Sequence, residues 1–348
     1  MQRTILRTIK SSAPIRICDN GGWTDTWFAG HGSIFNIAVY PYAEVQVRVF
    51  QNHGDSRRIT IHAEDYGEPY TISEPRGNYD KHPLLEAAFD CMRVPNNVAI
   101  EVSIHSEAPA GCSTGTSAAV SVALIGALDR LTAGAMRPHD VAFTAHRIET
   151  ELLGQQCGIQ DQIASAYGGI NFIEMRSYPQ STVMRIRVPD AIWWELESRL
   201  SLIYVGEAHN SSDVHRMVIR ELENAGPDSE KLRPLRATAA LSRDAVYAGD
   251  FAALGRAMIE NTEAQARLHP ALVSPRHHKI IEIARAHGAS GWKVNGAGGD
   301  GGSLTILSGP DAAARRAMLR EIAQSDSRFR NIPIYLSRFG LRVWDARA

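Results

Sequence analysis

The chain has 348 residues, of which 44% are hydrophobic and 22% are charged. These values are typical of a folded globular protein with one large domain or two of ordinary size. Its 37 basic and 38 acidic side chains give a formal net charge of −1, which gives no support to nucleic-acid binding or to attachment to a membrane surface.

The four cysteines lie far apart and form no CxxC pair, which argues against a zinc site or a disulfide framework and predicts reduced thiols. They are Cys18, Cys91, Cys112 and Cys157. The basic stretch at residues 1–17 has no long apolar core, so we expect no signal peptide. No segment approaches the ~18 consecutive apolar residues of a membrane span. These features predict a cytoplasmic protein that does not interact with membranes.

Strand patterns dominate the first hundred residues. β-Branched and aromatic residues predict strands over residues 35–50, and alternating patterns predict them over 57–64 and 97–107. Between them, residues 82–93 have the spacing of a helix.

Helical patterns follow in the next segment. Residues 117–131 are rich in alanine and apolar on most sides, which predicts a buried helix. Residues 137–154 predict a second helix, with Pro138 in its first turn and Gly154 at its end. Residues 157–175 are expected to run from a loop into a short helix, a glycine turn and a strand.

A change of pattern at residues 176–197 indicates a domain boundary. This stretch contains two prolines and has no strong helical period. We therefore divide the chain into an N-terminal domain, residues 1–185, and a C-terminal domain, residues 186–348.

The second half predicts a strand at 201–208 and long charged helices over most of 212–286. Strand-like runs at 302–309 and 331–344 surround a helix at 311–324. Helices grouped against an antiparallel sheet, rather than alternating with parallel strands, indicate an α+β fold.

Three glycine-bearing segments are candidates for binding. In the first, APIRICDNGGWTDT, Gly21 and Gly22 end a strand, Arg16 lies within the strand, and Asp25 follows on a turn. The guanidinium of Arg16 could pair with phosphate. A glycine pair before a polar turn is also common without any function.

The second segment is PAGCSTGTSAAV, residues 109–120, directly before the alanine-rich helix. Unpaired backbone N–H groups and the helix dipole favour an anion at such a position. The glycines allow close approach, and Thr116 and Ser117 offer hydroxyls. A simple serine or threonine N-cap is an equally good interpretation of these residues alone.

The third segment, WKVNGAGGDGG, has five glycines in residues 296–302. So many glycines would cost conformational entropy without a compensating role, which favours function over a plain turn. Two carboxylates, Glu149 and Asp161, could divide the work near a phosphate, one binding Mg²⁺ and the other facing an acceptor hydroxyl. Each taken alone is more often a solvated charge.

Together and in this order, the three segments resemble the motifs of the GHMP kinase superfamily, named for galactokinase, homoserine kinase, mevalonate kinase and phosphomevalonate kinase. The resemblance runs from Ala13 to Ser303. It implies an α+β fold in which an N-terminal domain like domain 2 of ribosomal protein S5 precedes a ferredoxin-like C-terminal domain. ATP and substrate would bind in the cleft between them.

The resemblance also implies roles for individual residues. Asp161 would face the acceptor hydroxyl, and Arg16 would lie near the transferred phosphate as the second catalytic residue. Ser117 and Glu149 would bind Mg²⁺. Asp25 would hydrogen-bond the hydroxyls of a sugar.

The remaining site residues follow from the same motifs. The ATP-binding loop would comprise Pro109, Ala110, Gly111, Cys112, Ser113, Thr114, Gly115, Thr116 and Ser117. The acceptor would contact Gly22, Thr24, Gly298 and Gly299 in addition to Asp25.

The sequence departs from the family pattern in two places. The usual PxxxGLGSSAA is replaced by PAGCSTGTSAA, so that Ser113, Thr114 and Thr116 stand for Gly, Leu and Ser. The first motif is closer to the GGWTDT of L-fucokinase and the GGGTD of the heptose-phosphate kinases, such as D-glycero-D-manno-heptose 7-phosphate kinase, than to that of galactokinase. This favours a sugar 1-kinase that phosphorylates the anomeric hydroxyl of a fucose-like hexose or a heptose (phosphate).

Three alternatives have different sequence support. A kinase of a non-sugar alcohol is disfavoured by the carboxylate in GGWTD, and a silent sensor of ATP and sugar by the presence of both Glu149 and Asp161. A nicotinamide dehydrogenase would place GxGxxG between an early strand and its helix, unlike this chain. The partner is expected to be a small sugar or sugar phosphate, with homodimer formation left open.

The identity of the acceptor cannot be predicted from these residues. Side chains that could line its pocket are His31, Tyr167, His209 and Asn210. Side chains that could bind a phosphate already present on it are Arg48, Arg57 and Arg58.

Overall fold

The computed structural model describes residues 4–64, 67–75, 77–109, 111–206, 211–222 and 225–347. Twelve strands occur in these segments: β1 (Ile5–Asn20), β2 (Gly32–Gln51), β3 (Ile59–Ala63), β4 (Tyr70–Ile72), β5 (Val98–Ser106), β6 (Ile170–Ser177), β7 (Gln180–Ile186), β8 (Leu200–Tyr204), β9 (Gly291–Val294), β10 (Ser303–Leu307), β11 (Arg330–Ile332) and β12 (Arg342–Asp345).

The same segments contain ten α-helices: α1 (Pro83–Met92), α2 (Thr116–Asp129), α3 (Pro138–Arg147), α4 (Gln160–Tyr167), α5 (Asp190–Arg199), α6 (Ser211–Leu222), α7 (Arg233–Ala248), α8 (Phe251–Leu268), α9 (Pro275–Ala286) and α10 (Ala312–Ser325). A π-helical turn, Ile148–Leu152, extends α3, and a short 3₁₀ turn, Pro270–Leu272, follows α8.

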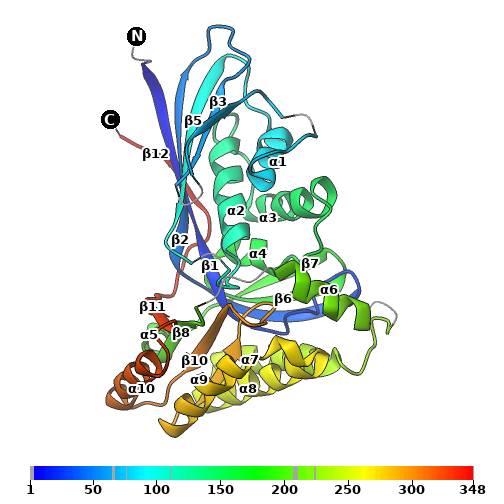
Figure 1. Ribbon diagram of the computed structural model, residues 1–348, viewed down its shortest axis with the longest axis vertical. Coiled ribbons are helices and arrows are strands. Elements are labelled where there is room, and N and C mark those ends of the chain that lie inside the picture. Colours follow the sequence, from blue (N-terminus) through cyan, green and yellow to red (C-terminus); the bar gives the residue numbers. More distant parts are fainter. Residues whose placement is uncertain are drawn as a thin grey trace.

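The larger sheet is built around the long antiparallel pair β1 and β2. Its order is β12-β1-β2-β5-β3-β4. In addition, β6 pairs with the first part of β2 on one side and with β7 on the other. All its pairings are antiparallel except that of β3 with β5. Helices α1 to α4 lie on one side of this sheet (Figure 1).

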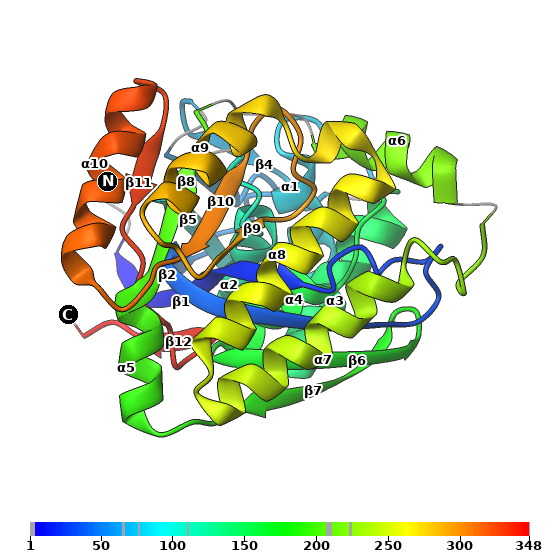
Figure 2. The ribbon, with the colours of Figure 1, turned by 90° about the horizontal axis from the view of Figure 1, so that it is seen from below.

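The burial of β2 changes along its length and shows where the sheet has two covered faces. Residues 34–39 are all buried, whereas residues 43–49 alternate between buried and more exposed positions. A strand covered on both faces is buried continuously, and one covered on a single face alternates. The fully buried part lies where α7 packs against β1, β2 and β6, on the face opposite α4 (Figure 2).

The smaller sheet has the order β11-β8-β10-β9, and all its pairings are antiparallel. Apolar side chains of α9 and α10, among them Ile280 and Met318, pack against its buried strands. A third apolar cluster contains Trp23 and Phe28 from the turn after β1, together with residues of α6, α7 and α8. Apolar packing against these three helices therefore anchors the turn.

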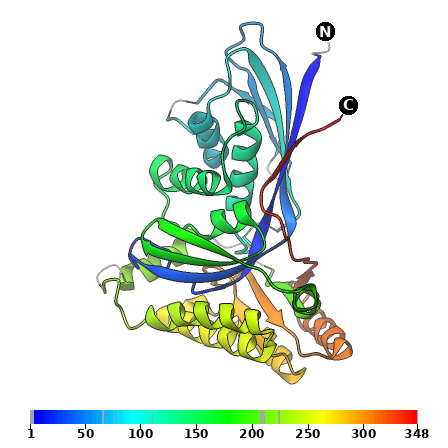
Figure 3. The same ribbon diagram turned by 180° about the vertical axis from the view of Figure 1, so that it is seen from behind.

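The predicted division at residue 185 stays a prediction. The break between the two sheets falls close to it, because β7 ends at Ile186 and β8 begins at Leu200. The end of the C-terminal half nevertheless joins the larger sheet, since β12 pairs with β1 (Figure 3).

The structure confirms the elements expected from periodicity and corrects two of them. Residues 176–197, which lack a helical period, form β7 and α5; only Trp193 and Leu196 of α5 are buried, which leaves little periodic pattern. The single strand-like run over 331–344 is two short strands, because Pro333 cannot donate to a ladder and the backbone at Gly340 packs against Ala166. Within the described residues, the helices are too short or too polar to cross a bilayer.

The end of α4 tests how tightly the C-terminal segment fixes this helix. Gly168 has φ +63°, and a Cβ there would lie 2.1 Å from the backbone carbon of Phe339. We expect Gly168→Ala to lower the free energy of unfolding by on the order of 2–4 kcal/mol, measured by chemical denaturation, because backbone strain and overpacking act together.

Gly288→Ala is the matched control. Gly288 has φ +71° but nothing within 4 Å of the added Cβ. Only the cost of the left-handed conformation remains, about 1–2 kcal/mol. Equal losses for the two variants would contradict the proposed packing of α4 against the C-terminal segment.

Candidate active site

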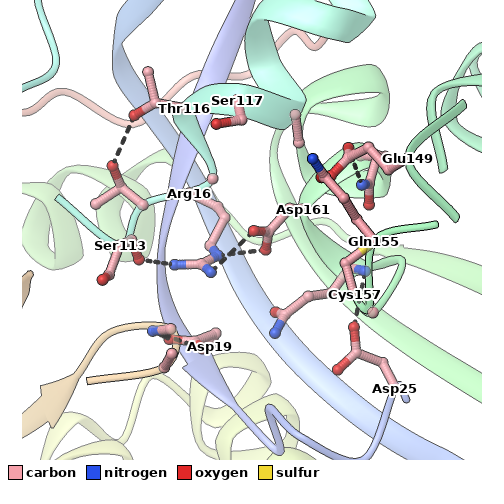
Figure 4. A pocket seen from close by; sticks show the side chains of 18 of the residues that line it. Arg16, Asp19, Asp25, Ser113, Thr116, Ser117, Glu149, Gln155, Cys157 and Asp161 are labelled. Atoms are coloured by element: carbon pink, nitrogen blue, oxygen red, sulfur yellow. Dashed lines mark hydrogen bonds and ion pairs between the residues drawn. The ribbon is translucent and has the colours of Figure 1, made fainter. Parts of the chain in front are cut away.

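The three glycine segments meet at a cavity of about 660 Å³. Its walls come from the end of β1 and the following turn, residues 111–118, the π-helical turn, residues 154–162 and the loop after β9. Figure 4 shows Arg16 and Asp161 between the loop residues Ser113 and Ser117 on one side and Glu149 and Cys157 on the other.

The loop before α2 ends in a glycine cap. Gly115 has φ +72° and is the N-cap residue, and no side chain caps the helix. The alternative of a serine or threonine N-cap is therefore wrong. The first N–H groups of α2 lack a capping side chain where the helix begins at the cavity, and a helix N-terminus of this kind favours an anion.

The residues that depart from the family pattern contribute to the conformation of this loop. Ser113 has φ +58°, a left-handed conformation that glycine adopts at lower cost. The hydroxyls of Thr114 and Thr116 lie 3.4 Å apart and can share a hydrogen bond. Gly115 leaves room for Asp161, since a Cβ at residue 115 would lie 3.1 Å from the carboxylate carbon.

Arg16 connects three parts of the site. Its Nε and Nη2 donate to the two carboxylate oxygens of Asp161 at 2.8 and 3.2 Å, and its Nη1 donates to the Ser113 carbonyl. Its backbone N–H donates to the carbonyl of Thr114 at 2.9 Å. Burial acts to lower the pKa of Arg16, but the charges of Asp161 and Asp19 outweigh it, so that the pKa lies above its usual value.

Asp25 lies at the far wall of the cavity and is almost fully buried. Its Oδ2 accepts the backbone N–H of Gln160 at 3.0 Å, and a Cβ at Gly158 would lie 2.0 Å from the same oxygen, so a larger residue there would displace the carboxylate. Burial raises the pKa of Asp25 to about 6, with repulsion from Asp161 adding to the effect.

Glu149 and Ser117 both line the cavity that also contains Asp161 (Figure 4). Glu149 is buried and accepts the amide of Gln162 at 2.7 Å. Burial raises its pKa to about 7, and the charge of Asp161 contributes. Burial is therefore the main cause of the raised pKa of Glu149, and the hydrogen bond from Gln162 opposes it.

This donor set fits Mg²⁺. The carboxylate and hydroxyl oxygens are hard ligands, and the buried negative charge favours a cation. Within the described part of the chain, no cluster of three or more His, Cys, Asp or Glu residues could enclose a metal. Mg²⁺ commonly binds through one or two carboxylates, with phosphates and water completing its shell, so a small protein ligand set is consistent with it.

The loop at residues 154–158 is held from behind by two aromatic side chains. The Tyr178 hydroxyl donates to the Cys157 carbonyl at 3.0 Å and lies 2.9 Å from Nε2 of His146. Burial lowers the pKa of His146 to about 4, so its ring is neutral. Burial and the charge of Glu149 hold the pKa of the Cys157 thiol well above its usual value.

Several predicted site residues lie outside the cavity wall. Thr24 is buried, and its hydroxyl donates to the Gly21 carbonyl at 2.7 Å, so its role is to stabilise the turn. Gly22 packs against the carboxylate of Asp19. Gly298 and Gly299 contact the carbonyl of Leu272, because the third glycine segment turns away from the cavity after residue 297.

The ends of the second segment also differ from the prediction. Residues 111–117 line the cavity as predicted, whereas Pro109 does not, and its carbonyl accepts the N–H of Cys112. Ala110 lies outside the described residues, as do His209 and Asn210.

The side chains suggested for the acceptor have other contacts. The Tyr167 hydroxyl lies 3.3 Å from Nδ1 of His139. The His31 carbonyl accepts a hydrogen bond from the guanidinium of Arg236. Arg48 pairs with Glu101, and Arg58 donates to backbone carbonyls of residues 94–98. Arg57 donates to the Thr71 carbonyl, away from the cavity.

The structure adds lining residues that the sequence analysis did not select. Most are amides or small residues, and the full set is Asp19, Trp23, Thr26, Leu84, Ala118, Gly154, Gln155, Gln156, Cys157, Gly158, Gln160, Gln162, Arg216, Gly296 and Ala297. The repeated glutamines in GQQCGIQDQ, around Asp161, were the available sequence signal for this wall.

Comparison with known protein families agrees with this arrangement. Residues 83–169 match the GHMP kinases N terminal domain, and residues 242–324 match the GHMP kinases C terminal domain. The first match contains the loop before α2, the π-helical turn and α4, which carry most of the cavity wall.

Curated relatives match over most of the chain. The chain is 26% identical to a bifunctional fucokinase/GDP-fucose pyrophosphorylase of Arabidopsis thaliana over 93% of its own length, but spans only about a third (32%) of that protein. It is 23% identical to D-glycero-alpha-D-manno-heptose 7-phosphate kinase of Campylobacter jejuni, over 85% of this chain and 88% of the relative.

A mevalonate kinase of Thermococcus sibiricus is 30% identical over 71% of this chain and 69% of the relative. A solved D-glycero-D-manno-heptose 1-phosphate kinase from Bacteroides thetaiotaomicron has a TM-score of 0.76, with 20% identity, over 98% of this chain and all of that one. The motifs, the fold and these matches agree: the chain belongs to the GHMP kinase family.

Proposed function

We propose that the protein transfers the γ-phosphoryl group of ATP to a sugar hydroxyl, and that the acceptor is the anomeric hydroxyl of a fucose-like hexose or a heptose. The observation that carries the proposal is the Arg16–Asp161 pair between an anion-binding loop and a wall that contains Asp25. The fucokinase and heptose kinase relatives support a sugar as the acceptor.

The loop at residues 111–117 would hold the phosphates of ATP. Phosphoryl transfer depends mainly on positioning and on compensation of charge, with little covalent help from the protein. The N-terminal amides of α2 supply the positive end of the helix dipole. Arg16 would stabilise the charge that develops on the transferred group.

Asp161 would act on the acceptor. Its carboxylate is held by Arg16 and faces the cavity, so it can orient a hydroxyl and accept its proton. The freed oxygen then attacks the γ-phosphorus, and ADP leaves with the electron pair of the broken P–O bond.

Asp25 and the neighbouring glutamines would bind the remaining hydroxyls. The Oε1 atoms of Gln160 and Gln162 have no hydrogen-bond partner within the described residues. An ionised carboxylate accepts hydrogen bonds only, and an amide both donates and accepts, which suits a polyol. Asp25 and Asp161 would repel an anionic group placed directly against them, so this wall suits the part of the acceptor that carries hydroxyls.

Ser117 and Glu149 would hold Mg²⁺. When bound, the metal would neutralise phosphate charge and act as a Lewis acid. The protein's own contribution is to orient the Glu149 carboxylate, which accepts a hydrogen bond from the amide of Gln162 at 2.7 Å.

A kinase of a non-sugar alcohol is the second candidate, because a mevalonate kinase is among the relatives. Both candidates are tested by measuring ADP release with free and phosphorylated hexoses and heptoses, mevalonate and homoserine. ³¹P and ¹³C NMR of the product would identify the phosphorylated oxygen. Turnover of mevalonate or homoserine, with no turnover of any sugar, would contradict the sugar kinase assignment.

Asp161→Asn should lower kcat by at least ~10²-fold, within the usual range for losing a general base. The variant should still bind a nonhydrolysable ATP analogue, measured by calorimetry. Asp244→Asn, at an exposed carboxylate on α7 that does not line the cavity, is the control and should be fully active. Near wild-type turnover by the Asp161 variant would remove this residue from the reaction.

Asp25→Asn should raise KM for the acceptor and also stabilise the free enzyme. Because the folded-state pKa of Asp25 is raised to about 6 from 3.8, the folded state binds the proton more tightly, and stability falls as pH rises through this window. At pH 8 the variant should be more stable by on the order of 1–3 kcal/mol. The difference should vanish near the unfolded-state pKa, where both forms are largely protonated. A less stable variant at pH 8 would show that the charge is compensated.

Glu149→Gln should raise the Mg²⁺ concentration that gives half-maximal rate at least ~10-fold, because a charged ligand is replaced by a neutral one. Glu151→Gln is the matched control, since Glu151 lies on the same π-helical turn but is exposed and does not line the cavity. An unchanged Mg²⁺ dependence for the Glu149 variant would exclude it as a ligand.

A further inference from the structure

A buried ion pair joins the first and third glycine segments. Asp19 is the next-to-last residue of β1, and Lys293 lies in β9 of the other sheet. Nζ of Lys293 is 3.4 Å from Oδ1 of Asp19, and each side chain is only 1% exposed. Buried charges are costly unless they are paired and hydrogen-bonded, so this pair constrains how the two sheets meet.

Asp19 holds the backbone of the third segment directly. Both of its carboxylate oxygens accept the N–H of Gly296, at 3.1 and 3.0 Å. The other side of this glycine is also held, because the amide of Gln265 donates to its carbonyl at 2.9 Å.

Lys293 completes the arrangement. Its Nζ donates to the Oε1 of Gln265 at 2.9 Å and to the carbonyl of Val294. The ion pair and Gln265 therefore form a closed set of contacts around Gly296. We call these three side chains, Asp19, Gln265 and Lys293, the Gly296 clamp.

The clamped glycine faces the reacting part of the cavity. Gly296 has φ +57°, and a Cβ there would lie 2.8 Å from the Ser113 carbonyl oxygen and 3.2 Å from Nη2 of Arg16. The Ser113 carbonyl is the group that accepts from Arg16. A displacement of residue 296 would therefore act on Arg16 and on the loop before α2 together.

A second set of hydrogen bonds connects the same segments. The backbone N–H of Cys18 donates to Oδ1 of Asn295 at 3.0 Å, and the Ser303 hydroxyl donates to the carbonyl of Cys112 at 2.7 Å. These bonds bring the strands together, but neither contacts Gly296. Asp19 and Gln265 of the clamp hydrogen-bond Gly296 itself, the residue that lies against Arg16 and Ser113.

We infer that Asp19, Lys293 and Gln265 are positioning residues, which set Gly296 against Arg16 and Ser113 and thereby shape the nucleotide-binding wall. The inference rests on the proposed function only for nucleotide binding, and makes no use of the identity of the acceptor. Asp19 acts through Gly296 and is not placed on the transferred group.

Two double variants separate positioning from charge. Asp19→Asn with Lys293→Met removes both charges but keeps an acceptor for the Gly296 N–H. Asp19→Ala with Lys293→Met removes the acceptor as well. Neither leaves an unpaired buried charge, whose cost would obscure the result. Calorimetric titration with Mg²⁺ and a nonhydrolysable ATP analogue gives the affinity.

The Asn-containing variant should bind the analogue within ~3-fold of wild type, and the Ala-containing variant at least ~10-fold more weakly, because a small displacement of positioning groups has large effects. Hydrogen exchange should show faster exchange at residues 295–302 in the Ala-containing variant only. Equal affinities for the two variants, or wild-type affinity in both, would overturn the inference.

Gln265→Met tests the clamp from its other side if the Ala-containing variant fails to fold. It removes the bond to the Gly296 carbonyl and the bond that Gln265 accepts from Lys293, but keeps both charged side chains of the ion pair, and affinity should fall at least ~3-fold. An unchanged affinity overturns the inference. Analogue binding by wild type without turnover of any sugar would contradict the proposed function alone, and absence of binding would overturn both.

Discussion

The site depends on one side chain, the guanidinium of Arg16. It donates to Asp161 on α4 and to the Ser113 carbonyl in the loop before α2, and it lies against Gly296 from the other sheet. A planar group with several donors can connect three backbone segments in this way, which the ammonium group of a lysine could not do with the same geometry.

The site concentrates negative charge in a buried region. Asp19, Asp25 and Glu149 are all buried and line the cavity with Asp161, and burial raises the pKa values of Asp25 and Glu149. In the free protein this arrangement costs stability, mainly because Asp25 and Glu149 are held away from water, and the charge of Asp161 adds to the cost. Such a loss of stability in the free protein is expected where a site binds a cation and hydroxyl groups.

The site could be predicted from residue types that have special backbone or charge requirements. Gly115 was recognisable because a helix was expected to start directly after it, and Arg16 and Asp25 because they flank a glycine pair. Gly22, Thr24, Gly298 and Gly299 belong to the same motifs, but they serve turns and close packing instead. A motif can predict that a segment lies at a binding site, but it does not predict which of its residues face the ligand.

The sequence by itself determined the α+β class, the elements with clear periodicity and the three segments that meet at the site, because hydrophobic spacing and glycine usage are local properties. Only the tertiary structure decided that Asp19 pairs with Lys293 and that the glutamines of residues 155–162 form the wall opposite the loop. These contacts join residues far apart in the chain. They depend on how two sheets pack, and no local pattern encodes that packing.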